Sequence, residues 1–353
     1  MYPKLLVNLN HIRYNARFLL DKAQKLGVNI TAVTKVTHSH PEIVKVLFEE
    51  GFRNFGDSRI TNLKKIKSLS LPVSTTLLRL PQLSEVKEVV KYADVSLNSE
   101  LSTLKALNAA AQKQKKVHKV ILMVEAGDLR EGIMPEEVVP TVREVLNLKN
   151  LLLLGLGVNL ACYGGVIPRP ENLKLLLELK NEIEGKFSIP LPVLSGGNSA
   201  SLPLLFTGEL PAGINQLRVG EALLLGTNPL TGKPFSELKA DNFILQGEII
   251  ELKVKPSKPW GPQGRDAFGN YPSFPDRGIR KRAIVALGKQ EIYPEHLFPK
   301  LPGAFILGSS SDHLILDVED SPLLKIGDIL DFSLDYGGVL ASFSNIKEIK
   351  IIK

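Results

Sequence analysis

Lys35 is the residue whose sequence setting most strongly suggests chemistry. It follows a mostly β-branched or small apolar run, residues 30–34, that is typical of a buried strand. Pro41 comes after a polar turn and suits the first turn of a helix. A lysine at the end of a buried strand either extends its amine into solvent or is paired, neutralised or used covalently. The other candidate residues of the chain favour a covalent use.

A second candidate site is the glycine-containing segment 195–199, with the sequence SGGNS. Its glycines would let backbone N–H groups approach a ligand, and Ser199 offers a hydroxyl. Gly220 marks another turn at which backbone and ligand could come close. Such a segment can equally be a helix cap, but phosphate sites of barrels commonly follow the seventh and eighth strands. The expected positions of these residues therefore favour a phosphate site.

A phosphate site facing a buried lysine suggests pyridoxal phosphate held as a Schiff base by Lys35. The phosphate would anchor the cofactor, and an incoming amino acid would displace the lysine. Arg218 would lie deep in the same pocket. Because a guanidinium only donates hydrogen bonds, Arg218 against the pyridine nitrogen would leave that nitrogen unprotonated. The alternative for Arg218 is an ion pair that closes the barrel.

The elements that must position these residues alternate between strand-like and helical patterns from about residue 10 to residue 230, as in a parallel βα architecture. The predicted strands are residues 30–34, 54–57, 74–78, 95–98, 119–125, 152–159, 192–196 and 216–219. The predicted helices are residues 12–26, 41–50, 59–67, 83–92, 99–116, 135–148, 172–184 and 199–206. Eight such strands predict a (β/α)8 TIM barrel over residues 1–233. The Gly-rich dinucleotide turn of an open doubly wound sheet is absent.

The remaining residues, 234–353, show short strand patterns without convincing helices, separated by turns rich in Pro and Gly. The predicted strands here are residues 245–254, 282–287, 313–318, 329–334 and 346–351. This pattern predicts a smaller all-β domain at the C-terminal side of the barrel.

Composition narrows the class of protein. The longest apolar run, residues 151–158, is far shorter than a membrane span, and no secretory signal is recognisable, so we expect a cytoplasmic protein without a membrane partner. Cys162 is the only cysteine, which excludes an intrachain disulfide and a cysteine metal cluster, and no other ligand spacing predicts a metal site. The net charge of +7 comes from scattered basic clusters without interleaved aromatic residues, so we expect no nucleic acid partner.

Four motifs carry a family resemblance. They are residues 34–36 (TKV), 124–132 (VEAGDLREG), 197–200 (GNSA) and 218–226 (RVGEALLLG). With these motifs in this order, nearly the whole chain resembles the alanine racemase superfamily, and more closely its alanine/ornithine racemase branch. The resemblance implies a barrel that binds pyridoxal phosphate and a C-terminal β domain that contributes to the partner's active site in a homodimer.

The resemblance also implies roles for individual residues. Lys35 matches the Schiff-base lysine, Ser199 a phosphate ligand and Arg218 the partner of the pyridine nitrogen. Arg130 matches the arginine near the phenolic oxygen of the cofactor. Asp312 lies in a segment, residues 310–313, that resembles the one reaching into the partner's site near the substrate carboxylate.

Several residues depart from alanine racemase itself. Met123 stands where a carbamylated lysine would align, and Asn159 stands where a histidine would stack over the cofactor ring. The phosphate-binding tyrosine after the Schiff-base lysine is replaced at about Ser39, and Tyr336 is either a substitute phosphate contact or a core tyrosine. These departures make strict specificity for alanine doubtful.

The second base is the most open assignment. Lys289 stands near the position where the family's tyrosine base would be expected, and it is our candidate, followed by Tyr271 and His313. The alternative for Lys289 is an ordinary surface lysine.

These observations favour a pyridoxal-phosphate-dependent racemase that interconverts L and D forms of an amino acid by two-base transfer of the α-proton. Ornithine is the preferred substrate, with lysine and alanine as alternatives, and Asp57, Glu125 or Asp128 could accept a cationic side chain. A non-catalytic pyridoxal phosphate homeostasis protein is one alternative, although such proteins are a barrel alone. A decarboxylase is another, although that chemistry prefers a carboxylate at the pyridine nitrogen to the guanidinium of Arg218.

Overall fold

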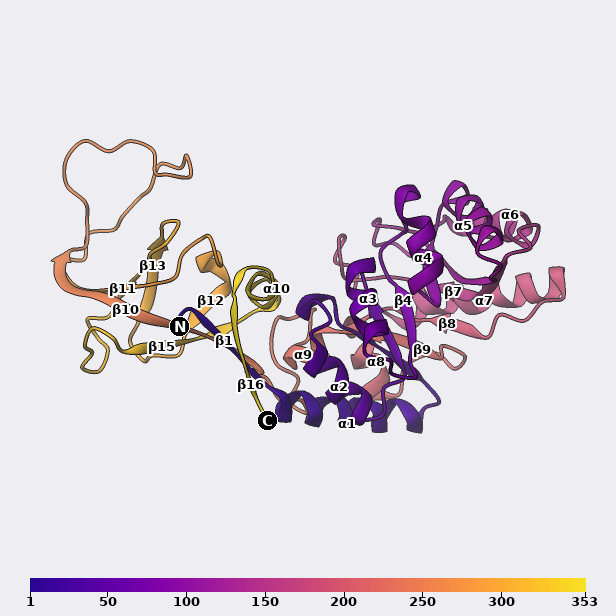
Figure 1. Ribbon diagram of the computed structural model, residues 1–353, viewed down its shortest axis with the longest axis horizontal. Helices are drawn as coiled ribbons and strands as arrows, with labels where there is room; N and C mark the ends of the chain where they lie inside the picture. The colour runs from indigo at the N-terminus through magenta and orange to yellow at the C-terminus, as the bar shows by residue number, and fades with distance from the viewer. The chain divides into compact units, whose positions relative to one another are not determined.

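The computed structural model describes residues 1–353, which form two compact units. One unit comprises residues 10–240, and the other comprises residues 1–9 together with 241–353. We call them the barrel unit and the β unit. In Figure 1 the barrel unit carries most of the indigo to pink part of the chain, and the β unit carries the orange to yellow part.

Eight parallel strands close the barrel in the order in which they occur in the chain, which confirms the predicted TIM-like barrel. They are β2 (Asn29–Val33), β3 (Asn54–Asp57), β4 (Ser74–Leu77), β5 (Val95–Asn98), β6 (His118–Met123), β7 (Leu151–Gly157), β8 (Val193–Ser195) and β9 (Gln216–Val219). Each of the eight predicted strands is therefore present within a few residues of its expected bounds.

Helices follow or precede these strands. They are α1 (Leu9–Lys25), α2 (Pro41–Glu49), α3 (Ile60–Ser68), α4 (Val86–Tyr92), α5 (Leu101–Lys113), α6 (Pro135–Leu146), α7 (Pro170–Phe187), α8 (Leu202–Thr207) and α9 (Glu221–Leu225). Pro41, Pro135 and Pro170 each occupy the first turn of their helix, where the missing N–H costs no hydrogen bond. None of the helices combines the length and the hydropathy that crossing a membrane requires.

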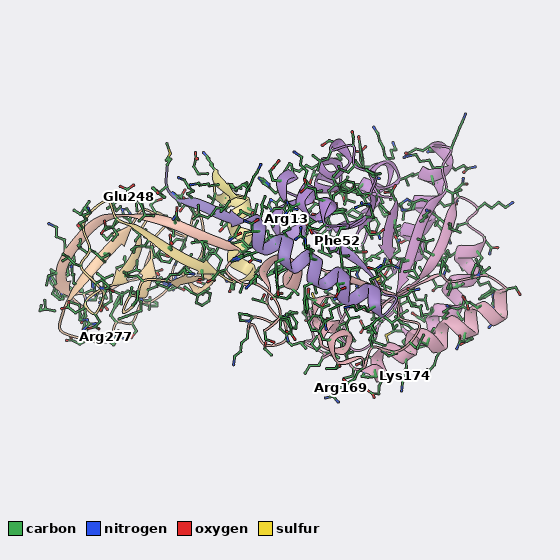
Figure 2. All side chains as sticks on the ribbon, turned by 90° about the horizontal axis from the view of Figure 1, so that it is seen from below. Arg13, Phe52, Arg169, Lys174, Glu248 and Arg277 are labelled. Carbon is green, nitrogen blue, oxygen red and sulfur yellow. The ribbon has the colours of Figure 1, made fainter.

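Two apolar layers hold the barrel together. Leu97, Ile121 and Met123 form a small buried cluster with neighbours from other barrel strands. Alternate strand residues such as Leu122 point the other way, into a larger cluster with the helices. The first helix is attached by charge as well, because Arg13, labelled in Figure 2, pairs with the two glutamates at the end of α2.

The β unit is built around one sheet, which confirms the predicted β domain. It also contains one α-helix that the sequence did not predict. Its strands are β1 (Lys4–Asn8), β10 (Phe243–Pro256), β11 (Ile279–Val285), β12 (Leu297–Pro299), β13 (Phe305–Ser309), β14 (Leu314–Asp317), β15 (Ile329–Leu334) and β16 (Glu348–Ile352). The main path runs β12-β15-β10-β11-β14-β13 through antiparallel pairs. The helix is α10 (Tyr336–Asn345).

The sequence-based division at residue 233 differs from the structure at the start of the chain. Residues 1–9 lie in the β unit, because β1 pairs antiparallel with β10 and parallel with β16. The expectation of a domain without helices was wrong for α10, whose glycines and serines give it a weak helical pattern. The side chain of Asp335 begins this helix by accepting a hydrogen bond from the Gly338 N–H at 2.8 Å.

Candidate functional site

Lys35 lies two residues after the end of β2 and begins a short 3-10 turn, residues 35–37. Burial lowers the pKa of its amine, and the charge of Arg130 acts in the same direction. The Cys162 sulfur and the carboxylates of Asp57 and Glu131 oppose this shift. An amine with a lowered pKa is more often neutral, as a lysine nucleophile must be.

Arg218 lies on β9 with only 5% of its surface exposed. Its Nη1 donates to the Ser195 hydroxyl, and its Nη2 donates to the carbonyl oxygen of Val158 at 2.7 Å. Burial lowers its pKa to about 10, which leaves the guanidinium charged at neutral pH. Because both partners are neutral, the alternative of an ion pair closing the barrel is not what the structure contains.

Hydrogen-bond donors converge at Ser199. Its hydroxyl oxygen accepts from the backbone N–H groups of Gly220 at 3.3 Å and Ala222 at 3.2 Å. The side chain of Asn198 caps the short turn of residues 199–201 by accepting from the Ala200 N–H at 2.8 Å. Gly220 leaves little room for a side chain, since a Cβ there would lie 3.0 Å from the Cβ of Val33. Two backbone donors and a hydroxyl in one place suit an anion such as phosphate.

Asn159 follows β7 and contacts the same segment. Its Oδ1 accepts a hydrogen bond from Asn198 Nδ2 at 3.2 Å, and the same Nδ2 donates to the carbonyl oxygen of Leu160 at 2.8 Å. The Asn159 Nδ2 is buried and has no hydrogen-bond partner. A buried amide donor without a partner is costly, so its position at the strand ends fits a ligand acceptor.

Arg130 and Cys162 lie on the loops that follow β6 and β7. Arg130 donates to both carboxylate oxygens of Glu131 and, through Nη1, to the Cys162 sulfur. The Glu131 side chain is only 13% exposed, whereas that of Arg130 is 37% exposed. Sequence reasoning did not identify Glu131 or Cys162 as site residues. Both residues lie on loops that follow neighbouring barrel strands, and this position could have identified them from the sequence.

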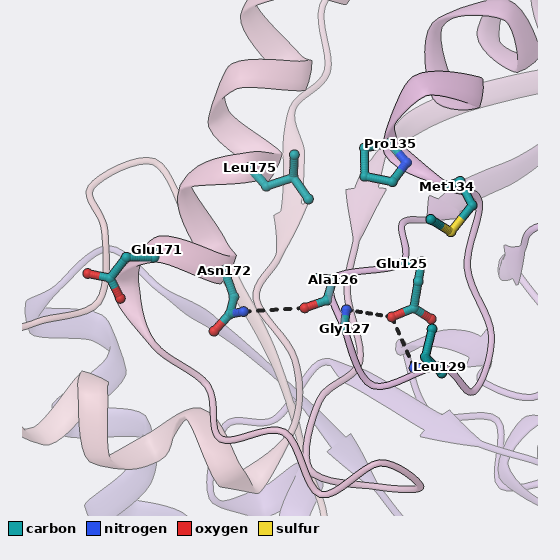
Figure 3. A pocket seen from close by; sticks show the side chains of 9 residues that line it. All are labelled: Glu125, Ala126, Gly127, Leu129, Met134, Pro135, Glu171, Asn172 and Leu175. Atoms are coloured by element: carbon teal, nitrogen blue, oxygen red, sulfur yellow. Dashed lines mark hydrogen bonds between the residues drawn. The ribbon is translucent and has the colours of Figure 1, made fainter.

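The three carboxylates expected to accept a cationic substrate side chain are engaged elsewhere. Glu125 Oε1 accepts from the N–H groups of Gly127 at 2.6 Å and Leu129 at 3.1 Å, as the dashed lines in Figure 3 show. Asp128 is 1% exposed and accepts backbone hydrogen bonds from the loop after β7, including that of Tyr163 at 2.9 Å. Asp57 is 0% exposed and accepts hydrogen bonds from the Ser39 hydroxyl, the Arg59 N–H and Asn62 Nδ2. All three carboxylates thus have hydrogen-bond partners within the protein, and their contact with a substrate side chain stays a prediction.

The pocket in Figure 3 is separate from the group formed by Lys35, Ser199 and Arg218. It has a volume of about 430 Å³ and lies between the loop after β6 and the first turns of α6 and α7. Its lining contains Met134 and Leu175 but neither Lys35, Ser199 nor Arg218. The residues that carry the candidate chemistry are instead those at the carboxyl ends of the barrel strands.

The remaining sequence-predicted residues lie in the β unit. The Lys289 amine sits 3.7 Å from the centre of the Phe268 ring. The turn that carries Lys289 is hydrogen-bonded to the turn that carries Asp312, from Lys289 N–H to the Ser310 carbonyl at 3.0 Å and from the Gln290 side chain to the Asp312 carboxylate. These contacts bring Lys289 and Asp312 together at one place in the unit.

The other three candidates of this unit lie apart from that pair of turns or are solvent-exposed. Tyr336 is the first residue of α10 and is partly buried. Tyr271 is 73% exposed, with the Arg265 guanidinium 5.4 Å from its ring centre. His313 is exposed at the end of the turn that carries Asp312.

Comparison with known proteins extends over both units. A family profile described as the N-terminal domain of alanine racemase matches residues 7–229. An ornithine racemase from Acetoanaerobium sticklandii is 48% identical over 347 residues, or 98% of each chain. A lysine racemase from Thermotoga maritima is 39% identical over 345 residues, which cover 98% of this chain and 97% of that protein. The structure of an alanine racemase from Bartonella henselae with covalently bound pyridoxal phosphate has a TM-score of 0.75 at 18% identity, over 99% of each chain.

Proposed function

Because the chain belongs to the alanine racemase family, we propose that it is a pyridoxal-phosphate-dependent racemase that interconverts L- and D-ornithine. Full-length similarity to two racemases supports an isomerase acting on amino acids, and the higher identity to the ornithine enzyme supports this substrate over lysine. The observation in the structure that carries the proposal is the placement of Lys35 and the donors around Ser199. They follow β2, β8 and β9, which are neighbours in the closed barrel.

The residues of the barrel unit fit the cofactor. The Lys35 amine would hold it covalently, and its lowered pKa favours that reaction. The Ser199 hydroxyl with the N–H groups of Gly220 and Ala222 would bind the phosphate. The partnerless Nδ2 of Asn159 would donate to a cofactor oxygen.

When bound, pyridoxal phosphate withdraws electrons from the substrate Cα and makes its proton acidic. Lys35 Nζ would remove or return this proton on one face of the substrate, and Lys289 Nζ is proposed to act on the other face. Arg218 would orient the ring as a donor, and its two neutral partners hold the guanidinium in a fixed direction. Arg130 would bind the substrate carboxylate or the cofactor oxygen beside it, and Tyr336 is proposed as a further phosphate contact.

The first test measures the ratio of D to L forms by chiral chromatography after incubating the cofactor-loaded protein with L-ornithine, L-lysine or L-alanine. We expect racemisation of ornithine at the highest kcat/KM, and its loss in Lys35→Ala, because the amine that moves the proton is gone. Lys45→Ala, an exposed lysine on α2, is the matched control and should remain active. A higher kcat/KM with lysine or alanine would mean that this amino acid, and not ornithine, is the substrate. A protein that binds the cofactor but racemises none of the three would contradict the proposal and favour a carrier.

We further propose a homodimer in which a second copy supplies Lys289 and Asp312, on the strength of the family resemblance. Mixed dimers of Lys35→Ala and Lys289→Ala chains test it, with each variant alone as the control. If sites are shared, one site of the mixed dimer carries both mutations and the other carries neither, so activity returns. If each chain forms its own site, every site carries one mutation and the mixture stays inactive.

A further inference from the structure

Asp57 is a completely buried carboxylate at the end of β3. Its Oδ1 accepts hydrogen bonds from the Arg59 N–H and from Asn62 Nδ2, both at 3.0 Å. Its Oδ2 accepts from the Ser39 hydroxyl at 2.8 Å, and the Thr34 hydroxyl oxygen lies 3.3 Å from the same atom. Burial raises the pKa of the Asp57 carboxyl, whereas the hydrogen bonds from Asn62, Ser39 and the Arg59 N–H favour its ionised form and oppose that shift.

The two hydroxyls that reach Asp57 belong to residues on either side of Lys35. Ser39 gives its proton to Asp57, so the Thr34 hydroxyl donates to Ser39 Oγ, 2.8 Å away. The backbone closes the same turn, with the Ser39 N–H donating to the Thr34 carbonyl at 3.1 Å and the His38 N–H donating to the Lys35 carbonyl at 3.2 Å. Lys35 therefore lies in a loop whose two ends are hydrogen-bonded to each other and, through Ser39, to one buried carboxylate.

The turn has a backbone that its sequence does not favour. His38 and Ser39 have φ angles of 48° and 51°, in the left-handed region that residues other than glycine rarely adopt. Such a conformation persists when surrounding contacts determine it, and it is found most often at functional sites. Two contacts tie this turn to β3: the Thr34 N–H donates to the Gly56 carbonyl at 2.9 Å, and the Ser39 hydroxyl donates to Asp57 at 2.8 Å.

We propose that Asp57 is a positioning residue that holds the turn of residues 34–39 and thereby fixes the Lys35 amine for proton transfer. The inference rests on the proposed function of Lys35. Asp57 acts through the turn, since its hydrogen bonds are made to groups of the protein and no substrate contact is required. Its negative charge also opposes the lowering of the Lys35 pKa that burial causes.

Two substitutions at Thr34 give the sharpest test, because the residue is buried and next to Lys35. Thr34→Val keeps the shape but removes the hydroxyl, and Thr34→Ser keeps the hydroxyl. We expect Thr34→Val and Asp57→Asn to lower kcat by roughly ten- to a hundredfold with little change in KM, because a small displacement of a reacting group is enough for such a loss. Thr34→Ser should retain the kcat of the unsubstituted protein.

Asp94→Asn is the matched control for loss of a carboxylate in the same barrel. Asp94 precedes β5, at the amino ends of the strands, and accepts from the Thr75 N–H at 2.8 Å, the Thr75 hydroxyl at 3.0 Å and Lys67 at 2.6 Å. Its substitution removes a comparable set of hydrogen bonds without touching the turn of Lys35, so kcat should not change.

Hydrogen exchange of the peptide covering residues 34–39, measured without cofactor, reports on the turn itself. We expect faster exchange in Asp57→Asn and Thr34→Val, and unchanged exchange in Thr34→Ser and Asp94→Asn. Normal kcat and normal exchange in Asp57→Asn would overturn the proposal. If Asp57→Asn does not fold, the kcat and the exchange of Thr34→Val compared with those of Thr34→Ser test the proposal. If the unsubstituted protein does not racemise ornithine, the proposed function fails, and the exchange data still decide whether Asp57 holds the turn.

Discussion

The two arginines of the candidate site are held in different ways. Arg218 belongs to the floor, which we define as Ser195, Ser199 and Arg218, and it is fixed by a hydroxyl and a backbone carbonyl. Arg130 belongs to the rim, which we define as Arg130, Glu131 and Cys162, and it is held by a neighbouring carboxylate and a thiol. The floor arginine is buried, whereas more than a third of the rim arginine's side chain is exposed.

This difference separates two ways of using the same side chain. On the floor the charge has no carboxylate partner, and its direction is set by strands β7, β8 and β9 of the closed barrel. On the rim the charge is balanced by Glu131, and its direction depends on loops that the barrel does not constrain. We therefore expect kcat to fall with any change of geometry in the floor. In the rim we expect kcat to depend mainly on the charge of the side chains.

The same substitution in both places tests this contrast. Lysine keeps the charge of arginine but cannot donate in two fixed directions. We expect Arg218→Lys to lower kcat by about a hundredfold, because the ring contact and both neutral partners are lost together. Arg130→Lys should lower kcat less, by roughly tenfold, because a flexible ammonium can still pair with Glu131. Both values come from initial rates of ornithine racemisation.

Melting temperature and cofactor absorbance provide the control for this pair. A large loss of stability in Arg218→Lys would assign its effect to folding, so the comparison uses only variants that melt close to the unsubstituted protein. Equal losses of kcat at the two positions, with folding intact, would contradict the distinction between floor and rim.

The sequence predicts the floor better than the rim for a physical reason. Strand β9 and the segment after β8 follow from local apolar patterns, and a barrel then brings their carboxyl ends together. For this reason Ser199 and Arg218 could be chosen without the structure. The rim depends on how two loops fold back, and no local pattern says that Arg130 turns toward Cys162 rather than into solvent.

Similar limits explain the differences elsewhere in the chain. Strand β1 was missed because its partners, β10 and β16, come more than two hundred residues later in the chain. Asp57 was expected to contact the substrate side chain because it ends a barrel strand. A carboxylate at that position can face either the barrel mouth or the helices, and the sequence does not determine which. Lys289, Asp312 and Tyr336 lie in the β unit, and their roles at the site stay predictions.

The smallest effect we predict concerns the charges of the rim. Glu131 raises the pKa of the Lys35 amine, and Arg130 lowers it. Removing the carboxylate in Glu131→Gln should therefore lower that pKa further, so that the neutral amine is present at lower pH. Arg130→Gln should raise it, so that higher pH is needed. The measurement is the pH dependence of Lys35 acetylation by a water-soluble reagent in the protein without cofactor, followed by peptide mass spectrometry.

Opposite directions are the decisive feature of this prediction, because a general loosening of the loop would move both variants the same way. Glu136→Gln, an exposed carboxylate in the first turn of α6, is the matched control and should leave the acetylation profile in place. The shifts should shrink as salt is added, since the Arg130 side chain is partly exposed to solvent. Shifts in one direction, or shifts that salt does not alter, would mean that the rim acts on Lys35 through structure and not through charge.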